Sequence, residues 1–96
     1  MNTNVDSLFS LGQIVSTPGA LSALGKEGID ASSLLERHAN GDWGEMSEED
    51  KRENDLSAAE GFRILSAYTL PHTGVKLWVI TEADRSVTTL LLPDEY

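Results

Sequence analysis

The sequence predicts an α+β domain in which short helices precede a small antiparallel β-sheet. Helix-capping residues and short amphipathic segments occupy residues 17–60, whereas β-branched and aromatic residues dominate residues 62–92. Two turn signals divide that second half into three segments of strand length. The length of 96 residues fits one domain. We assign it to residues 8–96, after a polar and flexible N-terminus at residues 1–7.

Two short helices are expected at the start of the domain. Thr17 and Pro18 are typical of a helix start, as the N-cap and the first helical residue. Gly25 and Gly28 are expected to end this helix, with Gly25 as the candidate for a left-handed cap. Asp30 is expected to cap the second helix, which an Asn-Gly pair ends.

A third helix is expected to carry much of the acidic charge. Ser47 is expected to cap its start and Gly61 to end it. Glu48 and Glu49 suit the positive end of the helix dipole. The segment contains few apolar residues. We therefore expect this helix to lie on the surface and to contact the rest of the domain along a narrow stripe.

The second half is expected to form an antiparallel meander of three strands. Their residues are 62–70, 75–83 and 87–92, separated by one four-residue loop and one tight turn. Residues 8–16 are expected to form a short strand or an extended arm. If this segment joins the sheet, the sheet has four strands.

The lengths of the two turns predict a strand register. The four-residue loop pairs Leu70 with Val75. The tight turn pairs Trp78 with Leu91. Both sheet faces are apolar in this register, whereas a sheet with one solvated face alternates apolar and polar residues. We therefore expect both faces to be covered, one by the helices and the other by the N-terminal arm or by a second copy of the protein, which leads to a homodimer hypothesis.

The overall charge excludes several classes of partner. Acidic residues number 16 and basic residues 7, for a net charge of −9. This sign argues against direct binding to nucleic acid and against attraction to anionic membranes. No apolar run approaches the roughly 20 residues of a membrane span, and the N-terminus lacks the features of a secretory signal. We therefore expect a cytoplasmic protein.

Most of the negative charge lies in residues 42–60, where eight acidic and two basic residues give −6 of the total of −9. Such a run is either a solvated helix face that maintains solubility or a surface directed at a basic partner protein. The nucleic-acid groove of a DNA-handling enzyme is a partner surface of this kind. The candidate partner-binding residues are Asp42, Trp43, Glu45, Glu48, Glu49, Asp50, Glu53 and Asp55.

The sequence contains no recognisable arrangement for catalysis. His38 and His72 lie in different elements, and we expect His38 to interact with the last carbonyls of its helix and His72 to be solvated in a hairpin loop. There is no cysteine, no phosphate-binding glycine motif and no serine in a nucleophile elbow. We therefore expect a protein that is not an enzyme and that uses no cofactor and no metal.

Two further features each have two interpretations. Trp43 either anchors its glycine-flanked loop or contacts a partner as an interface hot spot. The polar hairpin tip with Glu82, Asp84 and Arg85 is either a secondary polar site or ordinary turn chemistry. Under the second interpretation Glu82 pairs across the strands with Arg63.

Several segments resemble a known family. The sequence resembles the small uncharacterised bacterial proteins called plasmid-related proteins, over nearly the whole chain from Leu11. The motifs HxxGDWG and WVITEADRSxTT are the specific ones. The segments that carry the resemblance are LGQIVSTPGAL, LLERHANGDWG, EEDKREN, RILSAYTL and WVITEADRSVTTLLLPDEY.

This resemblance implies an origin on plasmids and other mobile elements, but it supplies no catalytic residues. Some family members carry the name type I restriction endonuclease subunit M. A DNA methyltransferase needs a glycine-rich S-adenosylmethionine loop and an Asn/Asp-Pro-Pro-aromatic motif, and this sequence has neither. The resemblance therefore indicates a genomic context and no mechanism.

Charge, motifs and resemblance together predict a non-enzymatic acidic interaction protein of a mobile genetic element. Its partner would be a protein with a basic surface, such as a nucleic-acid-processing enzyme of host defence, which it would inhibit in the manner of an anti-restriction or anti-CRISPR protein. The alternative is a small homodimeric structural or regulatory module without catalytic activity, in which the acidic helix only provides solubility.

Overall fold

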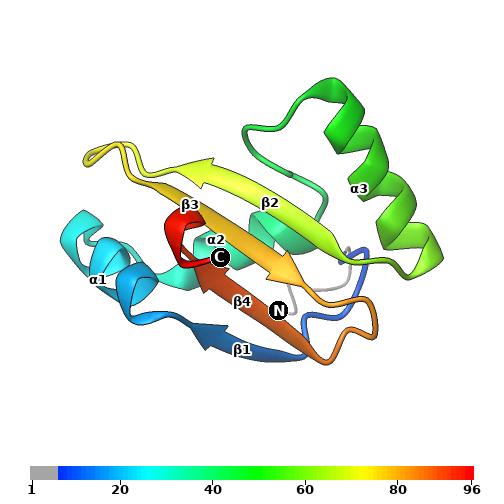
Figure 1. Ribbon diagram of the computed structural model, residues 1–96, viewed down its shortest axis with the longest axis horizontal. Helices are drawn as coiled ribbons and strands as arrows, with labels where there is room; N and C mark the ends of the chain where they lie inside the picture. The colour runs from blue at the N-terminus through cyan, green and yellow to red at the C-terminus, as the bar shows by residue number, and fades with distance from the viewer. Residues whose placement is uncertain (1–6) are drawn as a thin grey trace.

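A four-stranded sheet with the strand order β1-β4-β3-β2 lies at the centre of the fold. The computed structural model describes residues 7–96 and confirms the α+β class (Figure 1). The expected flexible N-terminus therefore lies, apart from Ser7, outside the described residues. The elements in chain order are β1 (Gln13–Ser16), α1 (Pro18–Glu27), α2 (Ala31–Ala39), α3 (Glu48–Glu60), β2 (Ile64–Thr69), β3 (Lys76–Thr81), β4 (Val87–Leu91) and the short 3-10 helix η1 (Pro93–Glu95).

The sheet contains the expected antiparallel meander and one parallel strand. Strands β2, β3 and β4 pair in the predicted register, with Trp78 opposite Leu91. The Leu70 N–H donates to the Val75 carbonyl at 2.8 Å, as the loop length predicted. β1 joins as the fourth strand but runs parallel to β4, so the sheet is mixed rather than wholly antiparallel. Parallel neighbours need a long connection, which the three helices and strands β2 and β3 provide here.

The helix starts are capped as predicted, but the left-handed cap of α1 is a different glycine from the expected one. The side chains of Thr17, Asp30 and Ser47 each accept a backbone N–H in the first turn of α1, α2 and α3. Helix α1 ends at Gly28, the second of the two expected glycines, and this residue rather than Gly25 is the left-handed cap, with φ 77°. Its N–H closes the last turn of α1. Gly25 is tolerated inside the helix.

One face of the sheet packs against α1 and α2. In Figure 1, α2 passes behind the sheet, whereas η1 lies in front of it. Apolar side chains from the two helices and from β2, β3 and β4 meet there in one buried cluster, which excludes water and supplies the main hydrophobic stabilisation. Its members are Ala20, Ala23, Leu24, Leu34, Tyr68, Leu70, Leu77, Val79 and Leu90.

Among residues 7–96, the C-terminus covers part of the opposite face. The Tyr96 ring packs edge-on against Trp78 with the ring centroids 5.7 Å apart, and the Arg63 guanidinium lies 5.2 Å from the centroid of Tyr96. Leu65 and Val87 on the same face are half-buried. Residues 13–16 do not cover this face, because they extend the sheet as β1.

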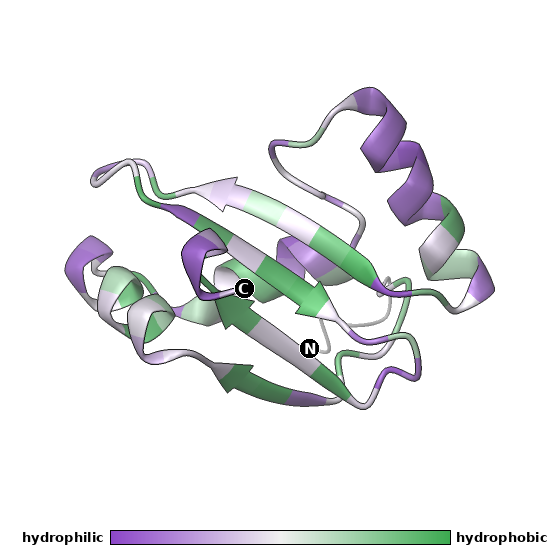
Figure 2. Cartoon of the chain, in the orientation of Figure 1, coloured by the Kyte–Doolittle hydropathy of each residue, from purple (hydrophilic) through white to green (hydrophobic). Residues whose placement is uncertain are grey.

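Helix α3 lies beyond the edge of β2, away from the other helices (Figure 1). Its first turns are strongly hydrophilic (Figure 2). Only Asn54 and Ser57 of this helix are buried, and Leu56 is 54% exposed. The expected surface helix is thus confirmed, although its contact stripe is polar rather than apolar. Within residues 7–96, no helix combines the length and apolarity needed to cross a bilayer.

Candidate protein-binding site

The loop before α3 runs along the outer edge of β2. Gly44 forms a β-bridge with Ala67, and the Ala67 carbonyl accepts the Glu45 N–H at 2.7 Å. Gly44 has φ 79°, and a Cβ there would lie 2.0 Å from the Ala67 oxygen. Only glycine fits this approach. The loop therefore fixes where α3 begins.

Trp43 anchors this loop inside the protein. It is only 3% exposed, and its Nε1 donates to Asp55 Oδ1 of α3 at 2.9 Å. Its ring stacks on Phe9 and meets His38 edge-on. The prediction that Trp43 is a partner-binding residue is therefore wrong, because an indole buried in this way offers no surface to a partner.

Asn54 attaches the middle of α3 to β2. Its Nδ2 donates to the Leu65 carbonyl at 2.7 Å, and its Oδ1 accepts the Leu65 N–H at 3.4 Å. The side-chain amide thus pairs with both backbone groups of one strand residue, as a neighbouring strand would.

Arg85, from the turn between β3 and β4, attaches the end of α3. Its guanidinium donates to the Ser57 carbonyl at 2.9 Å and to the Phe62 carbonyl at 2.7 Å. A cation suits the carbonyl end of a helix. Arg85 itself has φ 61° in the tight turn. Arg85, one of the three residues of the candidate polar site at the hairpin tip, therefore has a structural role.

The other two residues of the hairpin tip also have local partners. Asp84 Oδ1 accepts the Ser86 N–H at 3.0 Å, and hydrogen bonding to Ser86 lowers the pKa of the Asp84 carboxyl. Glu82 lies 3.8 Å from the Arg63 guanidinium, as the turn interpretation expects. The geometry thus favours turn chemistry over a separate polar site.

The acidic residues of the candidate surface fall into two groups, and the first group is paired locally. Asp42 forms an ion pair with Arg37 at 2.7 Å, and that guanidinium lowers the pKa of Asp42. The Thr69 hydroxyl donates to Glu45 at 2.6 Å and lowers the pKa of that carboxyl. Three further contacts complete the group: Glu45 with Lys76 at 3.6 Å, Glu48 with Lys51 at 3.5 Å, and Asp55 with Trp43.

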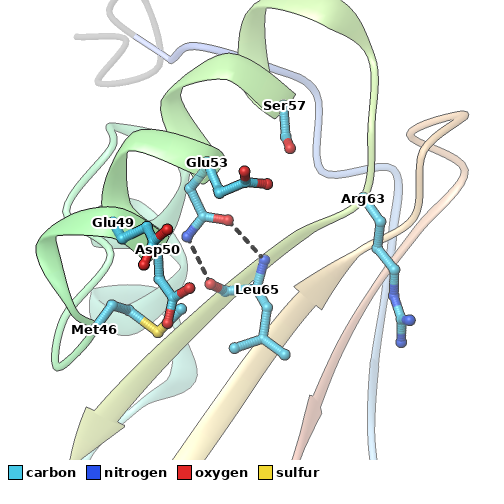
Figure 3. Close-up of a pocket in the computed structure, with 8 residues that line it drawn as sticks. Met46, Glu49, Asp50, Glu53, Ser57, Arg63 and Leu65 are labelled. Atoms are coloured by element: carbon cyan, nitrogen blue, oxygen red, sulfur yellow. Dashed lines mark hydrogen bonds between the residues drawn. The ribbon is translucent and has the colours of Figure 1, made fainter.

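The second group consists of Glu49, Asp50 and Glu53, which are exposed and have no cationic partner among the described residues. They line an open groove of about 660 Å³ between α3 and β2. Met46 and Leu65 provide its apolar surface, and Figure 3 shows the carboxylates on the helix side. The other lining residues are Asn54, Ser57 and Arg63. We call this feature the acidic groove.

His38 is fully buried, which corrects the expectation that it contacts the last carbonyls of α2. Its Nδ1 lies 2.5 Å from Ser66 Oγ and its Nε2 lies 2.9 Å from Thr81 Oγ1. The chain of bonds continues from Thr81 to Thr88, and from Thr88 to the Leu11 carbonyl. Burial, with a smaller effect of the Arg85 charge, lowers the pKa of His38 to about 4, so the imidazole is neutral at pH 7.

The sequence contains a signal for this network that reasoning from patterns alone missed. Ser66, Thr81 and Thr88 are polar, yet the predicted register places all three on the sheet face that the helices cover. Buried hydroxyls need hydrogen-bond partners. His38, in the helix that faces these hydroxyls, provides such a partner.

Glu27 forms a second buried polar contact, with the loop between β2 and β3. Its fully buried carboxylate accepts the backbone N–H groups of His72 and Thr73 at 2.8 and 3.1 Å, and the Thr73 hydroxyl at 2.9 Å. Burial raises the pKa of Glu27, but these bonds outweigh it and lower the pKa overall. The His72 side chain is 83% exposed, as expected for a loop residue, yet its Nδ1 also contacts Glu27.

Comparisons of this chain with protein-family models, with curated proteins and with solved structures found no match. The resemblance to plasmid-related proteins therefore stays a prediction.

Proposed function

We propose that this chain is a non-enzymatic interaction protein that binds a basic surface of a partner protein through the acidic groove. One observation carries the proposal. Glu49, Asp50 and Glu53 are exposed without a cationic partner among the described residues, beside apolar surface from Met46 and Leu65. Elsewhere on the same segment, acids such as Asp42 already have their counter-charge.

The groove suits a lysine- or arginine-bearing surface for two physical reasons. Exposed carboxylates steer a cationic partner toward the groove and orient it. Each exposed ion pair contributes only about 1 kcal/mol or less. Contact with the apolar surface of Met46 and Leu65 adds a term that salt does not screen.

In its finer form, the proposal makes the partner a nucleic-acid-processing enzyme of host defence, and the protein an inhibitor of the anti-restriction or anti-CRISPR type from a mobile element. A helix rises 1.5 Å per residue, and duplex DNA carries one charge per about 1.7 Å. Carboxylates along α3 can therefore occupy part of a basic groove built for phosphates. The mimicry is partial, because only three acids line the groove.

The buried position of His38 supports the non-enzymatic part of the proposal. His38 and Ser66 are hydrogen-bonded to each other but both are 0% exposed. A substrate cannot reach this pair in the folded protein. The contact is better explained as core polar packing.

The test compares capture of proteins from host lysate by three tagged forms of the chain. The first is the wild type, and the second carries Glu49→Gln, Asp50→Asn and Glu53→Gln. The third is a matched control with the same change in net charge, Ser22→Lys, Gly25→Lys and Ser32→Lys, at exposed positions of α1 and α2. All three positions are exposed, and a Cβ on Gly25 would meet nothing within 4 Å beyond its chain neighbours and its own helix backbone, so the control should fold.

We expect the neutralised form to bind the partner about tenfold or more weakly than the wild type, whereas the control binds it as the wild type does. Circular dichroism should show all three forms folded. Equal retention of the partner by the neutralised form, or equal loss in the control, would exclude the acidic groove as the binding surface.

A further inference from the structure

The two edges of the sheet differ in whether other parts of the chain cover them. At the β2 edge, Asn54 pairs with the backbone of Leu65. The next outward-facing residue, Ala67, donates to the Trp43 carbonyl at 3.1 Å and accepts from Glu45. Natural proteins commonly cover or block their sheet edges, because unpaired strand backbone invites another chain to add a strand. The β2 edge is covered in this way.

The β1 edge is open among the described residues. Gln13 donates to the Ser86 carbonyl at 2.9 Å and Thr17 donates to the Leu90 carbonyl at 3.0 Å. Alternate residues of a strand face the same neighbour, so Val15 also faces β4. The backbone N–H and C=O groups of Ile14 and Ser16 therefore point away from the sheet.

The side chains of this edge are apolar or uncharged. Ile14 and Val15 are 42% and 38% exposed, and Leu21 of α1 is 60% exposed. The strand Gln13–Ser16 contains no lysine, no proline and no other charged residue. Of the usual devices that block an edge strand, β1 therefore has only its short length of four residues, and it lacks charge and proline.

We infer that a second copy of this chain pairs with the outer edge of β1, antiparallel and centred on Val15. A two-fold axis at Val15 places Ile14 opposite Ser16 of the other copy, and Ser16 opposite Ile14 of the other copy. Each such pair exchanges both of its backbone bonds, which gives about four new hydrogen bonds. The two Val15 side chains meet at the axis on one face, and two four-stranded sheets become one continuous sheet.

The charge distribution selects a second copy as the occupant. Two molecules of charge −9 repel each other, so self-contact is disfavoured wherever acids gather. Residues 42–60 carry −6 of that charge and lie beyond β2, at the opposite edge of the sheet (Figure 1). Pairing through β1 puts the two acidic helices at the far ends of the dimer. Strand β1 carries no acid for a basic partner to recognise, and the carboxylate at its end, Glu95, already accepts the Thr17 hydroxyl and the Gly19 N–H.

The interface is short, so the dimer should be weak and concentration-dependent. The effect of salt distinguishes dimerisation through β1 from binding of a partner at the acidic groove. Salt screens the repulsion between the two copies, so the dimer should tighten between low and moderate ionic strength. Binding of a basic partner at the acidic groove should weaken over the same range.

Sedimentation equilibrium of the full chain, up to about 500 µM at two salt concentrations, tests this inference. We expect a monomer–dimer equilibrium for the wild type and a loss of dimer of about tenfold or more for Val15→Lys, which sets two like charges face to face. The matched control is Leu56→Lys, an apolar-to-lysine change at an exposed residue of α3, which should dimerise as the wild type does.

Hydrogen exchange provides a second measurement that needs no variant. The amides of Ile14 and Ser16 should exchange more slowly as concentration rises, while the Val15 amide, already bonded to β4, should not change. A monomer at the highest concentration would overturn the inference. So would a dimer that Leu56→Lys disrupts and Val15→Lys does not.

Discussion

At the scale of single residues, His38 shows how the core accommodates polar groups. Its two ring nitrogens, the hydroxyls of Ser66, Thr81 and Thr88, and the Leu11 carbonyl form one connected network. Among the described residues, no buried side-chain nitrogen or oxygen lacks a partner. A neutral imidazole suits this network, because a buried charge without a counter-charge would be costly.

The first prediction concerns pH. The pKa of His38 is lowered from 6.5 to about 4 in the folded protein, so between these values the unfolded chain binds a proton that the folded chain does not. Stability contributed by neutral His38 is thus complete above pH 6.5 and is lost as pH falls toward 4, by about 3 kcal/mol in total. Urea unfolding at pH 7, 6 and 5 measures this slope.

The control for this prediction is His38→Gln, which keeps a polar side chain but cannot titrate. Its stability should be lower at pH 7 and nearly independent of pH between 7 and 5. The carboxyls with lowered pKa values, such as Glu27 and Asp42, contribute their own loss only near and below their ordinary values of 4.5 and 3.8. The same slope in the variant and in the wild type would mean that His38 is not the titrating group.

At the scale of elements, α3 depends on specific polar contacts rather than on an apolar stripe. Its limits at Ser47 and Gly61 were predictable from capping residues, because these signals are local in sequence. Its attachment was not predictable. Contacts made by Asn54, Trp43 and Arg85 join it to three other parts of the chain, and no periodic pattern encodes such contacts.

The second prediction tests that attachment. Asn54→Ala should lower the free energy of unfolding by about 1–2 kcal/mol, because both backbone groups of Leu65 lose their partner. Amide exchange in α3 should accelerate more than in α1. Arg52→Ala, an exposed change on the same helix, should stay within about 0.5 kcal/mol of the wild type. Equal effects of the two substitutions would contradict this role of Asn54.

The third prediction concerns the loop before α3. Gly44 and Gly61 both have positive φ, 79° and 87°, but only Gly44 lies against other atoms. Gly61→Ala should therefore cost about 1–2 kcal/mol for the left-handed backbone alone. Gly44→Ala should cost clearly more, because its Cβ would meet the Ala67 oxygen. Chemical denaturation of both variants measures the difference, and a Gly44→Ala cost no larger than that of Gly61→Ala would show that the loop can move away from β2.

At the scale of the whole molecule, acidic charge is concentrated beyond the β2 edge of the sheet, whereas strand β1 at the other edge contains no charged residue. The position of the acidic segment at residues 42–60 was readable from the sequence. The separation of paired from unpaired acids was not, because Glu45 meets Lys76 only through the fold. The parallel direction of β1 was equally hidden, since no short turn connects this strand to β4.

The central claim is that the acidic groove binds a basic partner, and the most direct measurement is affinity capture from host lysate with washes at low and at moderate salt. The proposal predicts that mass spectrometry identifies a nucleic-acid-processing protein at low salt that the moderate-salt wash removes, since surface ion pairs weaken as the Debye length falls. Recovery of the protein alone at both salt concentrations would contradict the claim, and would leave the acidic helix with a role in solubility.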